Sequence, residues 1–303
     1  MSEEEARRLA AERAERRAAG DFGAADALRE RIEALGFRVT DTPEGFAMAP
    51  MEPAAPPEPP RLRPQDVPSV LDDPPDVDVT IHWLAEGWPE DVRRGIASFD
   101  AHRGSRRVQH VVVEAVPAPG GWPEGCEVLA MREGLGWARC RNAGLARSRG
   151  ALVFVVDGST EASGDVFGPL EAALADPSAG IAGPVGAVTD EQLHEFVPAE
   201  APECDAIEGY LMAVRREVLE RGVRFDDRFR FYRSADLDFS FAVKDLGLRA
   251  LMVEVPIERH EHRTWWSTEP QERAKLSKRN YYRFLDRWRG RSDLTVSGRG
   301  SSG

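Results

Sequence analysis

The chain has 303 residues, 42% of them hydrophobic, and a formal net charge of −12. This length suits one large domain, or one of ordinary size with an appendage, and the composition supports a globular core. The acidic balance argues against wholesale binding to nucleic acid or anionic lipid, although a local basic pocket can still exist. An anionic substrate would therefore have to bind at a local cluster of basic side chains.

Cysteine usage and apolar runs indicate the expected compartment. Cys126, Cys140 and Cys204 lack the spacing of metal ligands and are predicted to be free thiols in a reducing compartment. The amino terminus is charged and lacks the apolar region of a secretory signal, and no run of about 18 apolar residues predicts a membrane-spanning helix. We therefore expect a cytoplasmic protein without a transmembrane segment.

Residues 1–49 are predicted to form a small helical module. Residues 3–18 favour a helix through Ala, Glu and Arg, and a second helix ends before Gly36, which suits a left-handed C-terminal cap. The apolar residues of that second helix recur at helical spacing: Ala25, Leu28, Ile32 and Leu35. A short strand is predicted in "FRVTDTPEGF". The stretch "AADALRERIEALGFRVTDTPEGF" resembles the carboxyl-terminal tail of cysteinyl-tRNA synthetases, and the resemblance leaves open a docking or folding appendage and an RNA-binding role.

Two segments lack the patterns of regular structure. Residues 50–76 are dominated by proline, which removes backbone donors and favours extended conformations, so a linker is predicted. The low-complexity end, "SGRGSSG", predicts a disordered tail over residues 291–303. The remaining span, residues 77–290, is expected to be the principal domain.

From residue 77 onward, strand and helix patterns alternate, which predicts an α/β fold with a doubly wound, mostly parallel sheet. Strands are predicted at residues 77–84, 108–113, 127–130, 151–156, around 180, 206–214 and 248–255. Helices are predicted at residues 89–99, 136–148, 166–174, 216–221, 234–246 and 270–288. The run from Ala151 to Val156 has no polar side chain, so this strand is expected to be buried on both faces.

Polar residues at three places carry the chemical hypothesis. Asn142 lies on an otherwise apolar helical face, where a buried amide needs partners. Asp157 follows the apolar strand, and ligands in open α/β sheets sit beyond the carboxyl ends of such strands. Ser234 can cap a helix whose first turn holds Asp236 and Asp238, of which Asp238 is predicted to be structural. His260 and His262 follow the next strand and alternate, so at most one can face the site.

This order resembles the family 2 inverting glycosyltransferases, which have the GT-A nucleotide-sugar-binding fold. The matching parts are residues 136–150 with the Arg141-Asn142 pair, the strand ending at Asp157, "IEGYLMAVRREVLERGVRFDDRF", the helix containing Asp236, and the late histidines. The resemblance implies a nucleotide-sugar donor, a hydroxyl acceptor and Mg²⁺ or Mn²⁺. It also implies that Asp236 is the catalytic base, and that Asp157 with His262 or His260 holds the metal.

Three positions depart from the family pattern. Ser159 replaces the second acid of the Asp-x-Asp motif, Ala235 replaces the acid before the base, and Glu114 stands where an Asp contacts the nucleotide. Expected donor-binding residues are Glu114, Arg141, Asn142, Asp157 and Ser159. The predicted function is inverting glycosyl transfer. The alternative is a non-catalytic glycosyltransferase-like binding or scaffolding protein, and nucleic acid is not an expected partner.

Overall fold

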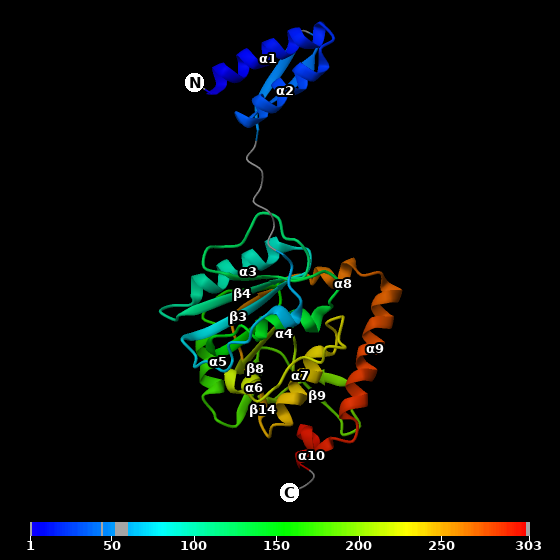
Figure 1. Cartoon of the computed structure of the whole chain (residues 1–303). Coiled ribbons are helices and arrows are strands. Elements are labelled where there is room, and N and C mark those ends of the chain that lie inside the picture. Colours follow the sequence, from blue (N-terminus) through cyan, green and yellow to red (C-terminus); the bar gives the residue numbers. More distant parts are fainter. Residues whose placement is uncertain (1, 44, 52–59, 301–303) are drawn as a thin grey trace. The chain divides into compact units, whose positions relative to one another are not determined.

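The computed structural model describes residues 2–43, 45–51 and 60–300. The chain divides into two compact units, Met1–Pro59 and Pro60–Gly303, which are treated separately below. Figure 1 shows the helices and strands of both. Residues 52–59, which belong to the predicted linker, lie outside the described residues. None of the helices in the described ranges has the length and apolar character needed to cross a bilayer.

The smaller unit packs two helices on a β-hairpin. It consists of α1 (Ser2–Ala18), α2 (Phe22–Ala34), β1 (Phe37–Thr42) and β2 (Gly45–Pro50), with β1 and β2 antiparallel. The predicted helices are confirmed, and Gly36 adopts the expected left-handed conformation at φ +84°. Leu28, Ile32 and Val39 form its core together with α1. The single strand predicted in "FRVTDTPEGF" ends at Thr42, and a second strand, which was not predicted, begins at Gly45.

The larger unit contains the predicted sheet, which is confirmed as mostly parallel. Its eight strands run in the order β11-β14-β8-β13-β6-β3-β4-β5. Their bounds are β3 Val77–Ala85, β4 Val108–Glu114, β5 Glu127–Ala130, β6 Gly150–Val156, β8 Ala179–Gly183, β11 Glu203–Cys204, β13 Leu211–Arg215 and β14 Arg249–Met252. Strand β3 pairs in parallel with β4 and β6, whereas β13 is antiparallel to both β6 and β8.

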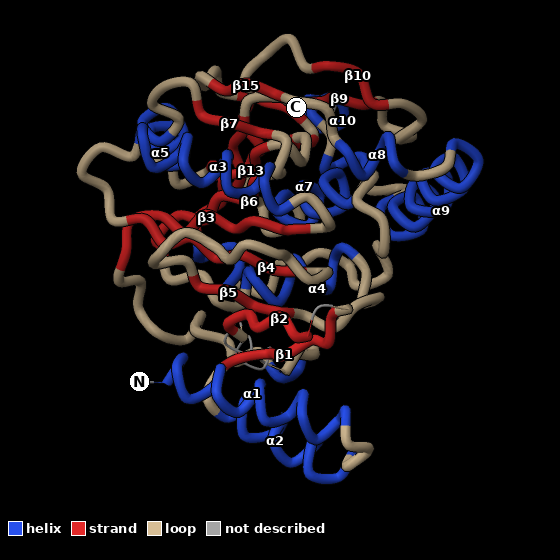
Figure 2. The backbone as a smooth tube through the Cα atoms, turned by 90° about the horizontal axis from the view of Figure 1, so that it is seen from above, coloured by secondary structure: helices blue, strands red, loops and turns tan. Residues whose placement is uncertain are grey.

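Helices cover both faces of this sheet, as Figure 2 shows from above. One face carries α3 (Pro89–His102) and α5 (Phe167–Leu174), and the other carries α4 (Trp137–Leu145), α6 (Arg216–Glu220), α7 (Ala235–Lys244) and α9 (Pro270–Trp288). In β6, Phe154 and Val156 join the core under α3 and α5, while Val153 and Val155 join the core on the other face. Burial on both faces is thus confirmed for residues 153–156, whereas Ala151 is exposed.

Close packing of α4 on β3 requires Gly144. A Cβ atom at this position would lie 1.8 Å from Nε2 of His82, which is fully buried in β3. No side chain larger than hydrogen fits there without moving the helix. This contact fixes α4 over the carboxyl half of the central strands.

Shorter elements complete the larger unit. Strand β7 (Thr160–Ala162) pairs with β15 (Ile257–Arg259), and β9 (Gly186–Thr189) pairs with β10 (Phe196–Pro198) and β12 (Ala206–Ile207). The single predicted strand 206–214 is therefore two strands, β12 and β13, separated by residues 208–210. The remaining short helices are η1 (Pro64–Asp66), α8 (Arg263–Ser267), η2 (Ser292–Leu294) and α10 (Val296–Gly300).

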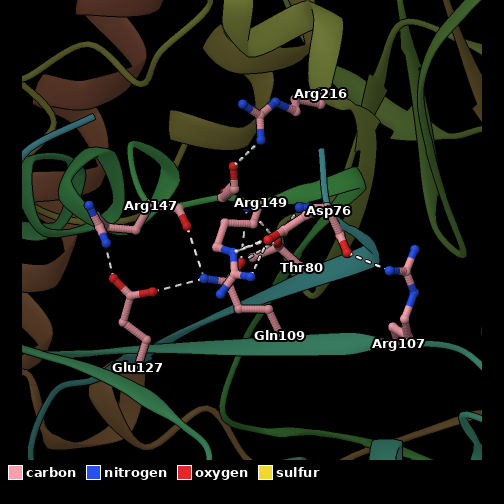
Figure 3. Close-up of polar contacts among 10 residues, drawn as sticks. Asp76, Thr80, Arg107, Gln109, Glu127, Arg147, Arg149 and Arg216 are labelled. Carbon is pink, nitrogen blue, oxygen red and sulfur yellow. Dashed lines mark hydrogen bonds and ion pairs between the residues drawn. The ribbon is translucent and has the colours of Figure 1, made fainter. Parts of the chain in front are cut away.

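A polar network joins the amino ends of the central strands (Figure 3). The Thr80 hydroxyl donates to Oε1 of Gln109 at 2.6 Å and accepts the backbone N–H groups of Arg149 and Gly150 at 3.0 and 2.7 Å. Gln109 Nε2 in turn donates to Glu127 at 2.9 Å. The network connects β3, β4, β5 and the start of β6, and satisfies polar groups that burial would otherwise make costly.

The linker is shorter than the sequence predicted. In the predicted linker 50–76, Val67 and Leu71 are buried in the core of the larger unit. Arg216 donates to the carbonyl oxygen of Val70 at 2.6 Å. The many prolines correctly predicted that this segment has little regular structure. The sequence patterns did not reveal that this extended chain packs on the sheet domain.

The predicted disordered tail, residues 291–303, is mostly wrong. Leu294 is buried, and the N–H of Val296 donates to Oδ1 of Asp205 at 2.7 Å. Asp205 also forms a fully buried ion pair with Lys244 at 2.7 Å. The carboxylate thus holds the start of α10 on the domain. The last three residues of the chain lie outside the described residues.

Candidate functional site

A cavity of about 200 Å³ opens beyond the carboxyl end of β6. Its polar lining comes from four separate segments of the chain: Asp157, Glu208, Tyr210, Arg233, Ser234, Asp236 and His262. Its apolar lining includes Trp137, Ala187, Phe196, Val197, Pro198 and Leu237. The place is the one that the sheet topology favours for a ligand.

Asp157 and His262 form the central pair of this cavity. Nε2 of His262 lies 3.1 Å from Oδ2 of Asp157, and both side chains are mostly buried. The hydroxyl and backbone N–H of Ser159 donate to Oδ1 of the same carboxylate. Burial alone would raise the pKa of Asp157, but His262 and Ser159 together hold it well below its usual range. Asp157 is therefore an ionised carboxylate in this site.

The orientation of His262 is determined by two neighbours. Its Nδ1 accepts the backbone N–H of Trp265 at 3.3 Å, and its ring stacks on Tyr232 with centroids 4.2 Å apart. These contacts leave Nε2 directed at Asp157. Burial lowers the pKa of His262, but the hydrogen bond and charge of Asp157 outweigh it and raise the pKa overall.

Of the two predicted histidines, only His262 reaches Asp157. His260 lies on the other side of the extended chain, where its Nε2 contacts Glu161 at 2.5 Å and 43% of its side chain is exposed. The alternation expected from the sequence explains the difference. His260 is thus not placed to share a ligand with Asp157, and Ser159 is occupied with the Asp157 carboxylate.

Asp236 enters the same cavity from the first turn of α7. Oδ2 accepts the N–H of Gly209 at 3.0 Å, and Oδ1 accepts that of Leu237 at 3.0 Å. Burial raises the pKa of this carboxyl, and the nearby Arg233 guanidinium opposes the rise only in part. Burial also raises the pKa of Glu208, with Asp236 adding to the effect.

The start of α7 differs from the predicted capped helix. Ser234 forms no side-chain cap bond and has a left-handed backbone at φ +63°. Such a conformation is uncommon for a residue with a Cβ and costs free energy. Asp238, two residues beyond Asp236, accepts from Arg287 at 2.9 Å and from Trp288 Nε1 at 2.8 Å. It therefore ties α7 to α9 and does not face the cavity.

Glu86 is a site residue that the sequence patterns missed. It follows β3 and lines a small cleft beside Asp157, Ser159 and His262. Burial raises the pKa of its carboxyl to about 7, against the opposing charges of Arg141 and His262. The predicted strand 77–84 ended two residues before Glu86, and no motif in the sequence pointed to this acid.

Arg141 lies beneath the site rather than in the cavity. Its guanidinium donates to the carbonyl oxygens of His82 at 3.2 Å and Val156 at 3.1 Å, joining the carboxyl ends of β3 and β6. Only 1% of the residue is exposed, and burial lowers its pKa to about 10. Its charge lies near Asp157 and Glu86. Arg141 thus adds positive electrostatic potential to the site from beneath Asp157 and Glu86, although its side chain does not line the cavities.

Two other predicted donor residues have structural contacts. Asn142 is half-buried rather than buried; it donates to the carbonyl oxygen of Phe225 at 2.8 Å and accepts its N–H at 3.0 Å, so the amide has the partners that the sequence led us to expect. Glu114 accepts from Trp122 Nε1 at 2.5 Å and lies 3.7 Å from Arg61. Neither residue lines the cavities described here. Their direct role in binding a donor therefore stays a prediction.

A second cavity, of about 180 Å³, lies beyond the ends of β3 and β4. It is lined by Glu86, Ala115, Val116, Gly134, Leu135, Gly136, Trp137, Cys140 and Arg230. Glu86 and Trp137 thus connect this space with the groups around Asp157. Burial raises the pKa of the Cys140 thiol to about 12, so it is a neutral packing group here and not a nucleophile.

Asp157 and His262 are hydrogen-bonded to each other, and they can become two adjacent ligands of a divalent cation when Nε2 of His262 gives up the proton that it shares with Asp157. Neighbouring ligands around an octahedral Mg²⁺ are about 3 Å apart, and the observed Nε2 to Oδ2 distance is 3.1 Å. No group of three His, Cys, Asp or Glu side chains suited to a metal occurs within residues 2–43, 45–51 and 60–300. The protein would thus supply two ligands, as is usual for cations that also bind substrate phosphates.

Comparisons with known proteins agree with this architecture. No protein-family model matches the sequence, and no curated protein matches it. Among solved structures, GalNAc-T7 with UDP, GalNAc and Mn²⁺ matches at a TM-score of 0.57 and 14% identity. The match covers 70% of this chain and 49% of that one, so the chain spans about half the length of that protein. The larger unit has the GT-A fold.

Two weaker similarities involve other transferases. The mannosyltransferase PcManGT of Pyrobaculum calidifontis, in complex with GDP-Man and Mn²⁺, matches at a TM-score of 0.49 and 17% identity, covering 81% of this chain and 80% of that one. S. aureus TarS residues 1–349 match at 0.45 and 11% identity, covering 69% and 72%. The fold assignment rests on the stronger match together with the strand order described above.

Proposed function

We propose that the larger unit is a glycosyltransferase that moves a sugar from a nucleoside-diphosphate donor to an acceptor hydroxyl with inversion. The observation that carries this proposal is the convergence of Asp157, His262 and Asp236 on one cavity at the carboxyl end of a GT-A sheet. A pair suited to a cation and a separate buried carboxylate are the two kinds of group that such a transfer needs.

Asp157 and His262 are the residues that would hold Mg²⁺ or Mn²⁺. The bound cation would neutralise the charge that develops on the leaving diphosphate. The structurally similar GalNAc-T7 is a complex with UDP, GalNAc and Mn²⁺, which supports testing Mn²⁺ and UDP-sugars first. Ser159 orients the Asp157 carboxylate by two hydrogen bonds instead of acting as a ligand.

Asp236 is the proposed general base. The acceptor oxygen forms a bond to the anomeric carbon, the bond from that carbon to the diphosphate breaks, and the acceptor proton passes to the Asp236 carboxylate. Bonds from Gly209 and Leu237 fix that carboxylate, and burial raises its pKa toward the range where a base is effective. Inversion follows from direct attack opposite the leaving group, in line with the family 2 resemblance.

A donor screen tests the proposal. We expect one nucleoside diphosphate to raise the melting temperature of the full chain in the presence of Mn²⁺, because a ligand of the folded state stabilises it. The corresponding nucleotide sugar is then incubated with candidate acceptors, and NMR coupling constants report the anomeric configuration of the product. No stabilisation by any nucleoside diphosphate, or a product that retains the donor configuration, would contradict the corresponding part of the proposal.

A non-catalytic binding protein is the second candidate. It is favoured by Ser159, whose hydroxyl is bound to Asp157, and by Ala235, which supplies no second acid beside Asp236. Such a protein would bind a nucleotide sugar without consuming it. Calorimetric binding of an intact donor, with no release of the diphosphate even when acceptors are present, is the result that distinguishes it from the enzyme.

A further inference from the structure

Positive charge is concentrated in one part of this acidic chain. Residues 263–291 contain nine Arg or Lys and three Asp or Glu, a net charge of +6, whereas the whole chain has −12. The remainder of the chain therefore carries −18. The segment includes α8 and α9, which Figure 1 shows along one margin of the larger unit. Such asymmetry creates a local potential of opposite sign to that of the whole protein.

The outer side of α9 carries this charge. Its inner side is buried in the core through Asn280, Phe284, Leu285 and Trp288. Four exposed basic residues are here called the α9 basic face: Lys275, Lys278 and Arg279 on the outer side, and Arg289 just beyond the helix end. The same helix also exposes the acidic side chains of Glu272 and Asp286. Lys278, Arg279 and Arg289 form no ion pair with any carboxylate in the described ranges of the chain. Their charges are thus available to an external partner.

Exposed apolar and aromatic side chains gather in the same region. In the larger unit, the three most exposed large hydrophobic residues are Trp266, Tyr282 and Val197, at 64, 51 and 47%. Trp266 is on α8 and Tyr282 is on α9, while Val197 is on β10 and lines the cavity of Asp157 and Asp236.

A broad groove adjoins the α9 basic face. It has a volume of about 680 Å³ and lies between residues 191–194 and α9, with Tyr282 and Arg289 in its lining. Tyr281 fixes the loop by donating to the carbonyl oxygen of Leu193 at 2.5 Å. Tyr282 and Arg289 thus place an exposed ring and an exposed cation at the edge of this groove.

We propose that the α9 basic face, together with Trp266 and Tyr282, docks this protein on an anionic lipid bilayer. Basic side chains near a negatively charged leaflet are attracted to it, while Trp and Tyr rings settle at the headgroup level. Because the inner side of α9 is already buried, the helix adsorbs to the surface and does not insert. Since α8 begins directly after His262, docking places the site close to the bilayer.

Lipid fits this surface better than a nucleic acid does. Trp266 and Tyr282 are not interleaved at a spacing that would stack successive bases, and aliphatic Val197 offers no ring for stacking. A bilayer accepts both aromatic and aliphatic side chains and contacts only one side of the protein. The acidic remainder of the chain would instead repel a long polyanion that extends beyond the basic face.

Vesicle sedimentation with the full chain tests this inference. We use vesicles of phosphatidylcholine alone and vesicles in which roughly one third is phosphatidylglycerol. We expect binding only to the anionic vesicles, and its loss when salt is raised from about 0.05 to 0.5 M. The double variant Lys278→Glu/Arg279→Glu should lose binding at least about tenfold, because two attractive charges become repulsive.

The matched control is Arg103→Glu/Arg221→Glu, which changes the net charge equally at two exposed arginines just beyond the ends of α3 and α6. It should bind as the unchanged chain does, and Trp266→Ala should bind several-fold more weakly with the charge retained. Equal loss in the control, equal binding to neutral vesicles, or binding of a single-stranded RNA in place of vesicles would overturn the inference. These readouts need no glycosyl donor, so they are independent of the proposed function.

Discussion

The two ends of the central strands use polar residues in opposite ways. At the amino ends, Thr80, Gln109 and Glu127 satisfy one another and the backbone of the following strand (Figure 3). At the carboxyl ends, Glu86 and Asp236 are carboxyls whose pKa values burial has raised. Polar groups whose hydrogen bonds are all satisfied stabilise a fold, whereas carboxyl groups whose pKa values are shifted by burial mark a candidate functional site.

The largest expected effect is at the carboxyl ends. Asp236→Asn should lower turnover on an identified donor by about 10³-fold while leaving nucleotide affinity nearly unchanged, because a general base acts on the transition state. Steady-state kinetics and calorimetry measure the two quantities. The control is Asp238→Asn, which faces α9 and should reduce thermal stability but not turnover at low temperature. Equal kinetic losses in both variants would remove Asp236 from the role of base.

The next effect concerns the cation pair. His262→Ala should weaken Mn²⁺-dependent nucleotide binding on the order of 100-fold, because one of the two protein ligands is lost. Calorimetry with and without Mn²⁺ measures this change. His260→Ala is the matched control, since its ring faces Glu161, and it should bind as before. A chain whose nucleotide affinity never depends on Mn²⁺ would contradict the assignment of Asp157 and His262.

Thr80→Val probes the amino ends. The change leaves the buried N–H of Gly150 without its hydroxyl acceptor, whereas the N–H of Arg149 keeps Oε1 of Gln109, so we expect a loss of about 2 kcal/mol in the free energy of unfolding. Nucleotide affinity should not change. Urea unfolding and calorimetry check the two parts. A stable variant with altered nucleotide binding would show that the contrast between the two ends is mistaken.

The smallest expected effect is the pH dependence caused by Glu86. Folding raises the pKa of its carboxyl to about 7, so the folded chain binds that proton more tightly than the unfolded chain does. The associated stability is present below the unfolded pKa and is lost as the pH rises through about 7. The free energy of unfolding should therefore fall by an amount on the order of 1 kcal/mol between acid and neutral pH, after allowance for solvent screening. Glu86→Gln should remove this fall. Urea unfolding at several pH values, with Glu90→Gln as an exposed control, measures it.

Local sequence patterns were sufficient for several parts of this structure. The apolar run 151–156 is a central strand because each of its faces meets a separate core, and Gly36 ends a helix because it accepts a left-handed backbone. The placement of Asp157 after that strand followed from the general geometry of α/β sheets. The resemblance of the first module to a cysteinyl-tRNA synthetase tail implies no contact that the structure tests, and it stays a prediction.

Other features depended on contacts between distant segments. Residues 60–75 were predicted as linker because proline patterns do not indicate what an extended chain packs against, and the tail was predicted as disordered because Asp205, which holds α10, is far away in sequence. Glu86 had no motif, and its raised pKa comes from burial by neighbours. Asn142 was recognised as an amide that needs partners, but its partner Phe225 was not foreseen.

By itself the sequence determined the order of strands and helices, the burial of β6 and the residue types available for binding a cation and a proton. Periodicity and turn residues act over short stretches of chain, so they can be read directly. Only the tertiary structure decided that His262 and not His260 reaches Asp157, that Glu86 lies beside this pair, and that α9 turns its charge outward. These choices depend on how packed elements rotate against one another, which short-range patterns do not specify.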